Sequence, residues 1–181
     1  MSTFISLLRA VNLAGHKVIS MDALRDLYAG IGLSHLRTYI QSGNVVFESP
    51  RDDLSELTRQ IEAHIEQAFG FHVEVFIRRP ADFLHILSNN PFLNDRHADP
   101  GKLYVTFLYQ ILSEETRSKL ANPTGTTDEY ALAAQEVYLY LPNGYAHTKL
   151  SNSFFEKKLG TCTTTRNWNT INALYRMAIT A

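Results

Sequence analysis

The sequence contains a single cysteine, Cys162, so no disulfide bond can form within the chain, which fits a reducing compartment. No apolar run approaches the ~20 residues that span a bilayer. The opening residues, MSTFISLLRAVNLAG, have no basic leader and carry Arg9 inside their apolar run, so we expect no signal peptide. The formal net charge of -1 argues against a dedicated binder of duplex DNA. These absences predict a cytoplasmic globular protein with no membrane partner.

Recognisable catalytic and metal-binding motifs are also lacking. Neither a P-loop nor a G-x-G-x-x-G sequence is present. His97 lies between Asp95 and Asp99 in NDRHADPG, a spacing that fits no zinc or calcium loop. Cys162 precedes a predicted helix, which would favour the thiolate, but a small packing residue is the preferred interpretation of a lone cysteine. We therefore expect no metal and no cofactor, and an enzyme of unknown reaction is only the third function considered.

Two similar successions of elements occupy the chain of 181 residues. The first half reads as strand, helix, hairpin, helix and strand, the βαββαβ order of a ferredoxin-like fold; its elements are expected at 4–11, 21–30, 38–47, 52–69 and 71–77. A short helix over 81–87 follows. The second half repeats strand, helix, hairpin and helix at 103–109, 113–120, 129–141 and 152–159, without a visible fourth strand. A final helix over 166–179 stands in that place. The prediction is an α+β fold with duplicated ferredoxin-like halves, about 1–90 and 100–181, in one compact unit with an extra C-terminal helix.

The hairpin TYIQSGNVVF organises the first half. A two-residue loop of Ser42 and Gly43 suits a tight turn, because glycine adopts positive φ without steric cost. That loop would place Ile40 opposite Val45, on a mostly apolar face that points to the core. The other face, which includes Asn44, reads as amphipathic.

Four ordered motifs identify a family resemblance. LLRAVNLAGHKVISMDALRDL, TYIQSGNVVF, KLSNSFFEKKLG and TTRNWNTINALYRM resemble the bacterial family catalogued as domain of unknown function 1697 (DUF1697). The resemblance implies a duplicated α+β fold with ferredoxin-like halves, and it implies no activity. Matching polar positions are Arg9, Asn12, residues 41–44, Lys149, Ser151, Asn152, Arg166, Asn167, Trp168 and Thr170.

Charge and polar residues suggest where a ligand would bind. Residues 143–181 contain five lysines and arginines and one acidic residue, and such a basic segment can mark an anion site. The alternative is a tail that docks on an acidic body. We predict a binding protein for a phosphorylated or other anionic small molecule, with a ligand site formed by Arg9, Asn12, Gln41, Ser42, Asn44, Lys149, Asn152, Arg166 and Asn167. The structural alternative is that Arg9 and Arg166 tie the C-terminal helix to the sheet.

RNA binding is the second function considered. A ferredoxin-like sheet can stack bases on aromatic side chains of its open face. By alternation, that face would carry Tyr39, Phe76, Tyr104, Tyr138 and Tyr140. The competing interpretation, which we prefer, is that helices or a dimer interface cover these rings.

Overall fold

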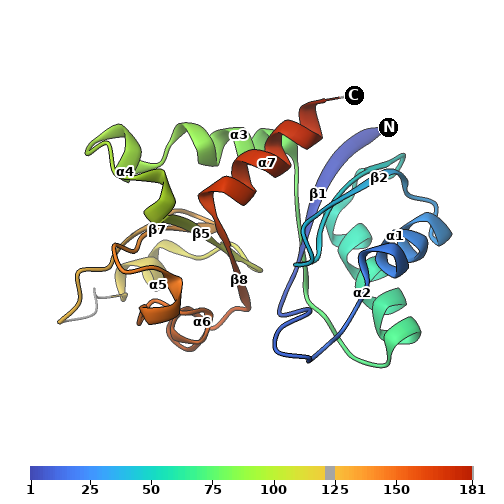
Figure 1. Cartoon of the computed structure of the whole chain (residues 1–181), viewed down its shortest axis with the longest axis horizontal. Coiled ribbons are helices and arrows are strands. Elements are labelled where there is room, and N and C mark those ends of the chain that lie inside the picture. Colours follow the sequence, from blue (N-terminus) through green and yellow to red (C-terminus); the bar gives the residue numbers. More distant parts are fainter. Residues whose placement is uncertain (121–124, 181) are drawn as a thin grey trace. The chain divides into compact units, whose positions relative to one another are not determined.

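The computed structural model describes residues 1–120 and 125–180 (Figure 1). The chain forms two compact units, Met1–His85 with Asn172–Ala181, and Ile86–Ile171. The boundaries between them fall inside two helices, α3 (Pro80–Ser88) and α7 (Trp168–Ile179). The predicted extra C-terminal helix is therefore present as α7. The prediction of a single compact unit stays a prediction.

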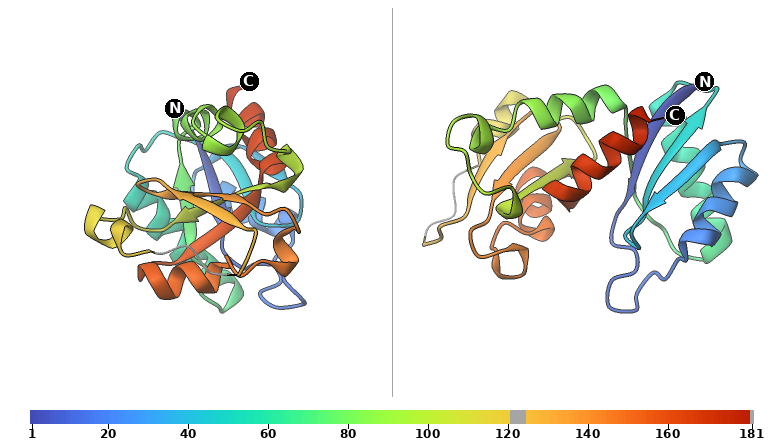
Figure 2. Two further views of the ribbon diagram at one scale, coloured as in Figure 1. Left: turned by 90° about the vertical axis from the view of Figure 1, so that its left-hand side faces the viewer. Right: turned by 45° about the horizontal axis from the view of Figure 1, so that its top comes forward.

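The first unit has the predicted βαββαβ order. Its elements are β1 (Ser2–Leu8), α1 (Met21–Gly30), β2 (Ser34–Tyr39), β3 (Asn44–Ser49), α2 (Leu54–Phe69) and β4 (Val75–Arg78). The strands form an antiparallel sheet in the order β2-β3-β1-β4, and α1 and α2 lie on one face of it (Figure 2). β1 is thus a central strand, as its apolar run predicts.

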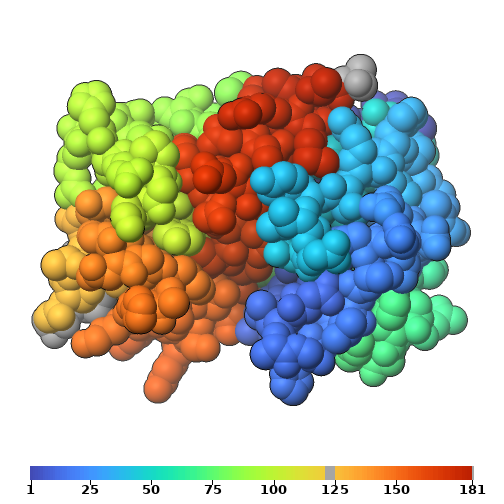
Figure 3. Space-filling view, in the orientation of Figure 1, coloured from blue at the N-terminus to red at the C-terminus, as the bar shows by residue number. Residues whose placement is uncertain are grey.

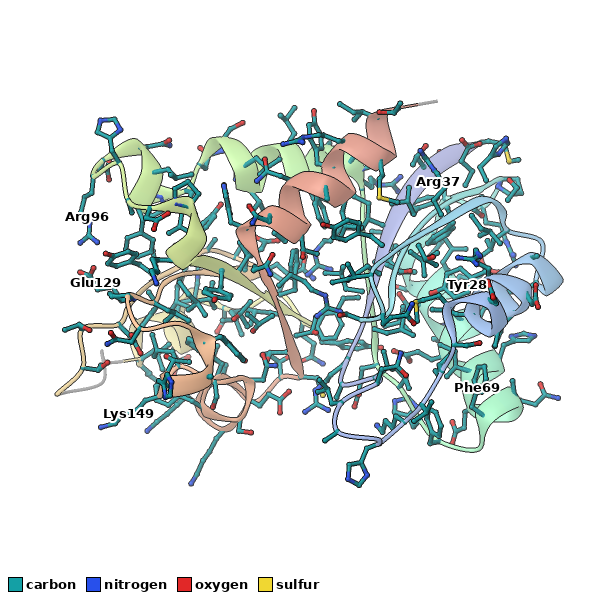
Figure 4. The ribbon with its side chains drawn as sticks, viewed as in Figure 1. Tyr28, Arg37, Phe69, Arg96, Glu129 and Lys149 are labelled. Carbon is teal, nitrogen blue, oxygen red and sulfur yellow. The ribbon has the colours of Figure 1, made fainter. Side chains whose placement is uncertain are left out.

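Local sequence signals set the two helices of this unit. The Ser20 side chain accepts a hydrogen bond from the Ala23 amide at the start of α1, and Asp53 does the same for Glu56 at the start of α2. Gly70 ends α2 in the left-handed conformation. One side of α2 packs its apolar residues into the core that also contains Tyr28 and Phe47 (Figure 4 labels Tyr28); these residues are Leu57, Ile61 and Ile65.

Both faces of the first sheet carry buried side chains. The face toward the helices buries Phe4, Phe47 and Val75, as predicted. The other face carries the predicted mixture of polar and apolar residues. Of these, Asn44 and Val46 have no exposed surface, and Arg37 and Glu48 are partly exposed. The hydroxyl of Ser6 and that of Tyr28 hydrogen-bond at 2.9 Å inside the core, and burial raises the pKa of the tyrosine well above its usual range.

The hairpin register differs from the prediction by two residues. Thr38, not Ile40, pairs with Val45, and Tyr39 pairs with Asn44. The loop therefore contains residues 40–43, with Ile40 at φ +50° and Gly43 at φ +72°. A shift of two residues leaves each strand side chain on the same face of the sheet, so Val45 and Phe47 lie in the core as predicted. Ile40 was expected on the core face, and this was wrong, because it lies in the loop and is 50% exposed.

The second unit repeats the order of the first. After α4 (Pro91–Asn94) and the 3₁₀ turn η1 (Pro100–Lys102) come β5 (Leu103–Leu108), α5 (Glu114–Ser118), β6 (Glu129–Leu132), β7 (Glu136–Tyr140), the 3₁₀ turn η2 (Tyr145–His147), α6 (Asn152–Leu159) and β8 (Thr163–Asn167). The antiparallel sheet order is β6-β7-β5-β8. This matches β2-β3-β1-β4 strand for strand, so the duplicated α+β fold predicted from the sequence is confirmed.

Strand β8 corrects the sequence prediction. The sequence predicts a helix that begins at Arg166 and no fourth strand in this unit. In the structure Thr165 pairs with Thr106 and Arg166 with Val105, so this segment is an edge strand. The helix begins two residues later, at Trp168, and the oxygen Oδ1 of Asn167 accepts a hydrogen bond from the Thr170 amide there.

The core of the second unit is formed by α6 and one face of its sheet. Val137, Leu139 and Phe155 are fully buried in it. Ser151 caps α6, where its side chain accepts a hydrogen bond from the Phe154 amide. None of the helices in the described residues is long and apolar enough to cross a membrane.

Candidate functional site

Several predicted ligand residues of the first unit gather at one end of its sheet, on the loop after β1 and on the hairpin loop. Arg9 follows β1, and its guanidinium lies 3.7 Å from the Glu74 carboxylate. Gln41 and Ser42 are on the surface in the hairpin loop. Figure 3 shows the two loops side by side at the surface, the first in dark blue and the hairpin in lighter blue.

Asn12 joins these two loops through its side-chain amide. Its Nδ2 donates to the carbonyl oxygens of Ile19 and Gln41, both at 2.8 Å. Its Oδ1 accepts from the Ile19 amide, also at 2.8 Å. The backbone of Asn12 is left-handed, with φ +56°, a conformation that asparagine tolerates better than most residues. The structure thus places the amide in internal hydrogen bonds.

Gly43 and Asn44 seat the hairpin loop against β1. The Leu8 amide donates to the Gly43 carbonyl at 2.9 Å. A Cβ on Gly43 would lie 2.7 Å from the Leu8 Cβ and 2.8 Å from Val11 Cγ2, so no other residue fits without displacement. Asn44 is fully buried, and its Nδ2 donates to the Tyr39 carbonyl at 3.1 Å.

A polar pocket of about 380 Å³ opens beside these loops, between the start of α1 and the hairpin. The Arg25 guanidinium crosses from α1 to β2, where Nη1 donates to Thr38 Oγ1 at 2.5 Å, and Nη2 contacts the Asp22 carboxylate. The pocket is lined by Ser20, Met21, Asp22, Arg25, Thr38, Ile40 and Gln41.

Of the pocket residues, only Gln41 belongs to the ligand set predicted from the sequence. Arg25 was missed because it reads as an ordinary polar position on an amphipathic helix. One sequence signal could have indicated an anion site here: Arg25 lies in the first turns of α1, near the Ser20 cap and the positive end of the helix dipole.

In the second unit, Asn152 binds threonine hydroxyl groups of β8. Its Oδ1 accepts from Thr163 Oγ1 at 3.0 Å and from Thr165 Oγ1 at 2.7 Å. Thr165 also hydrogen-bonds Thr106 Oγ1 at 2.8 Å. The Glu156 carboxylate accepts from the Thr163 amide at 2.9 Å. This network fastens α6 to the edge of the second sheet.

The remaining predicted residues of the second unit are Lys149, Arg166 and Asn167. Lys149 lies at the surface and extends away from the ribbon (Figure 4). Arg166 is half-buried, and its Nη1 donates to Thr164 Oγ1 at 2.7 Å and to the Thr165 carbonyl at 3.0 Å. Desolvation lowers the pKa of its guanidinium to about 10, so the side chain stays charged at neutral pH.

The four asparagines of the predicted site make hydrogen bonds within their own units. Gln41, Lys149 and Asn167 are exposed, and Arg9, Ser42 and Arg166 are partly exposed. That the predicted residues of the first unit and those of the second unit form one site stays a prediction. In the described part of the chain, no group of three or more His, Cys, Asp and Glu residues could hold a metal ion.

A comparison with protein-family models gives one relevant match. Residues 1–138 match the model of the family described as protein of unknown function (DUF1697). The chain belongs to this family. The resemblance inferred from the four sequence motifs is thus confirmed. None of the curated proteins compared with this DUF1697 member matches it.

A solved structure supports the fold of this DUF1697 member. The chain is similar to a conserved bacterial protein from Streptococcus pneumoniae, with 20% sequence identity and a TM-score of 0.71. The similarity covers 98% of each chain. At this level of identity, the likeness establishes the shared fold alone.

The aromatic side chains proposed as an RNA-binding surface have different environments in this DUF1697 member. Phe76 and Tyr138 are buried. Tyr104 was predicted on the open face, which was wrong, because it packs against the core beneath α6. Tyr140 lies 5.9 Å from the Phe92 ring.

Arg96 covers Tyr140 as well. Its guanidinium lies 5.2 Å from the Tyr140 ring centroid and binds the Glu129 carboxylate through two hydrogen bonds of 3.0 and 2.6 Å (Figure 4). Tyr140 is therefore partly covered by Phe92 of α4 and by Arg96.

Proposed function

We propose that this protein binds a small anionic molecule, phosphorylated or carboxylated, in the polar pocket between the start of α1 and the hairpin loop. The observation that carries the proposal is the position of Arg25, whose guanidinium reaches across this pocket to Thr38. Arginine holds carboxylate and phosphate groups through paired hydrogen bonds, and its charge does not depend on pH in the physiological range.

The surroundings of Arg25 favour an exchangeable anion. The guanidinium now contacts the Asp22 carboxylate, whose side chain is 86% exposed. An ion pair this exposed contributes little to stability, so the Asp22 side chain can move into solvent when another anion takes its place. The first turn of α1 adds the partial positive charge of a helix N-terminus, and Gln41 adds an amide at the pocket wall.

The larger set predicted from the sequence extends this proposal. Arg9 and Ser42 lie on the same two loops as the pocket, and Lys149 and Arg166 belong to the second unit. We infer that Arg9, Gln41 and Ser42 of the first unit recognise further parts of the ligand, while Asn12 and Asn44 shape the loops that carry them. This inference separates binding residues from structural ones and is tested by substitution below.

Thermal unfolding with added anions tests the pocket directly. Pyrophosphate, inorganic phosphate and citrate are titrated separately against the full chain. A ligand at 100 times its Kd stabilises the folded state by about 2.7 kcal/mol, which raises the melting temperature. Arg25→Ala should abolish the rise. Arg25→Lys should retain part of it, because lysine keeps the charge and loses the paired geometry.

The matched control is Arg59→Ala. Arg59 is exposed on α2 and hydrogen-bonds the Ser55 carbonyl of its own helix, so its loss changes the net charge equally without touching the pocket. The control should keep the full response to anions. No rise with any of the three anions, or an equal rise for Arg25→Ala and the parent, would reject the proposed function.

RNA binding on the open sheet faces has less support. Stacking requires exposed rings, and Phe76 and Tyr138 are buried while Tyr140 packs with Phe92 and Arg96. Salt-sensitive binding of a single-stranded RNA by the full chain would favour this function over the anion pocket.

A further inference from the structure

The residues that line the anion pocket come from the start of α1 on one side and from β2 and the hairpin loop on the other. A single side chain hydrogen-bonds to the backbone beside both parts. Asn12 Nδ2 donates to the carbonyl of Gln41, which lines the pocket. Asn12 also hydrogen-bonds both backbone groups of Ile19, and the next residue, Ser20, caps α1 and lines the pocket as well. The amide of Asn12 thus determines the distance between two walls of the pocket.

Both loops are held in unfavourable backbone conformations. Ala10, Asn12, Ala14 and Lys17 in the first loop have φ between +45° and +56°, and Ile40 in the hairpin loop has φ +50°. A left-handed conformation is unfavourable for a residue with a side chain, and such strain persists only where other contacts impose it. The three hydrogen bonds of Asn12, each 2.8 Å long, are contacts of this kind.

We propose that Asn12 is a positioning residue of the anion pocket, which it keeps in the binding conformation before the ligand arrives. The proposal rests on the proposed function of that pocket. A pocket that is already ordered spends less of its interaction energy on ordering loops, so it binds more tightly. Asn12 is half-buried and lies outside the apolar core, so its effect on the pocket can be separated from an effect on the fold.

Only asparagine provides this combination of groups. Its amide accepts one hydrogen bond and donates two at the same site, and its backbone tolerates positive φ. The substitution Asn12→Asp removes both donors, because it places a carboxylate oxygen against the carbonyls of Ile19 and Gln41, which are acceptors. Asn12→Gly keeps the backbone freedom and removes all three hydrogen bonds.

The experiment measures two quantities in the full chain. Hydrogen exchange without ligand reports the order of residues 13–19 and 40–43, and pyrophosphate titration reports affinity. For Asn12→Asp and Asn12→Gly, loop exchange should rise at least tenfold and pyrophosphate affinity should fall at least tenfold. Exchange of the β1 and β3 amides should change less than twofold. Asn94→Asp is the control, because that amide donates to the Ser88 carbonyl far along the chain; it should change neither quantity.

Each other outcome has a definite meaning. Unchanged affinity in both variants rejects the positioning role, whatever happens to loop exchange. A parallel rise in β1 and β3 exchange also rejects it, because Asn12 would then act on the whole unit. If the parent protein binds no pyrophosphate, phosphate or citrate, the proposed function fails and the pocket role of Asn12 fails with it. If, in addition, amide exchange of residues 13–19 and 40–43 is the same in the Asn12 variants as in the parent protein, Asn12 does not order the loops.

Discussion

Replacing Gly43 by alanine tests how closely the hairpin loop is seated on β1. Two costs are expected. Alanine at φ +72° pays roughly 1–2 kcal/mol for the left-handed conformation. Its Cβ would also lie 2.7 Å from Leu8 Cβ and 2.8 Å from Val11 Cγ2, and relieving such overpacking costs about 1–3 kcal/mol. Gly43→Ala should therefore destabilise the first unit by about 2–5 kcal/mol.

Gly70→Ala separates the two costs. Gly70 has φ +79°, and a Cβ there meets no atom within 4 Å, so only the conformational cost of roughly 1–2 kcal/mol applies. Both glycines belong to the first unit, so the assay is hydrogen exchange of the β1 and β3 amides, which reports opening of that unit. Equal destabilisation by the two substitutions would refute the close contact between Gly43 and β1.

Three further predictions concern the core, a buried hydroxyl and the second unit. Phe47→Ala should cost about 3–5 kcal/mol, because its fully buried ring packs against Phe4 and Tyr28; a loss under ~1 kcal/mol in urea unfolding would place this residue outside the core. Burial raises the pKa of Tyr28, so the tyrosine holds its proton more tightly in the folded state than in the unfolded state. Its contribution to folding stability is therefore fully present at pH values below its unfolded pKa of about 10. Above that pH this group should lower the free energy of unfolding by up to ~1.4 kcal/mol per pH unit. Urea unfolding at several pH values should show that the free energy of unfolding of Tyr28→Phe falls less steeply with pH than that of the parent; an equally steep fall would contradict the prediction. If Arg166 serves ligand binding, Arg166→Ala should leave the melting temperature without anion nearly unchanged, whereas a lower melting temperature without anion would assign it a structural role.

The fold was largely predictable where side-chain patterns repeat. Helices α1 and α6 have the predicted bounds. The Ser20 cap and the apolar spacing mark α1, and Gly160 marks the end of α6. Strand β8 was missed for a physical reason. Thr163 and Thr165 point toward Asn152 and Thr106, with which they form hydrogen bonds, so the strand has no alternation of apolar and polar residues. Threonine before a helix then resembles a cap.

The hairpin register was unpredictable for a different reason. A β-branched residue is disfavoured at positive φ, so no sequence rule places Ile40 in the left-handed region, where the loop of residues 40–43 requires it. The same limit applies to the candidate site. Asparagine is equally suited to bind a ligand or a backbone carbonyl, and only coordinates show that Asn12 hydrogen-bonds the backbone of Ile19 and Gln41.

The first unit consists of two separate pieces of sequence, Met1–His85 and Asn172–Ala181. On the ribosome, the second piece emerges only after the whole of Ile86–Ile171 has been made. The Thr180 carbonyl, which accepts a hydrogen bond from Arg37 Nη1 at 3.0 Å, is absent until then. The second unit is continuous in sequence and can be completed earlier, so the order in which the units are finished is the reverse of the order in which they begin. Nascent-chain folding of this protein should therefore depart from the usual completion of N-terminal domains first.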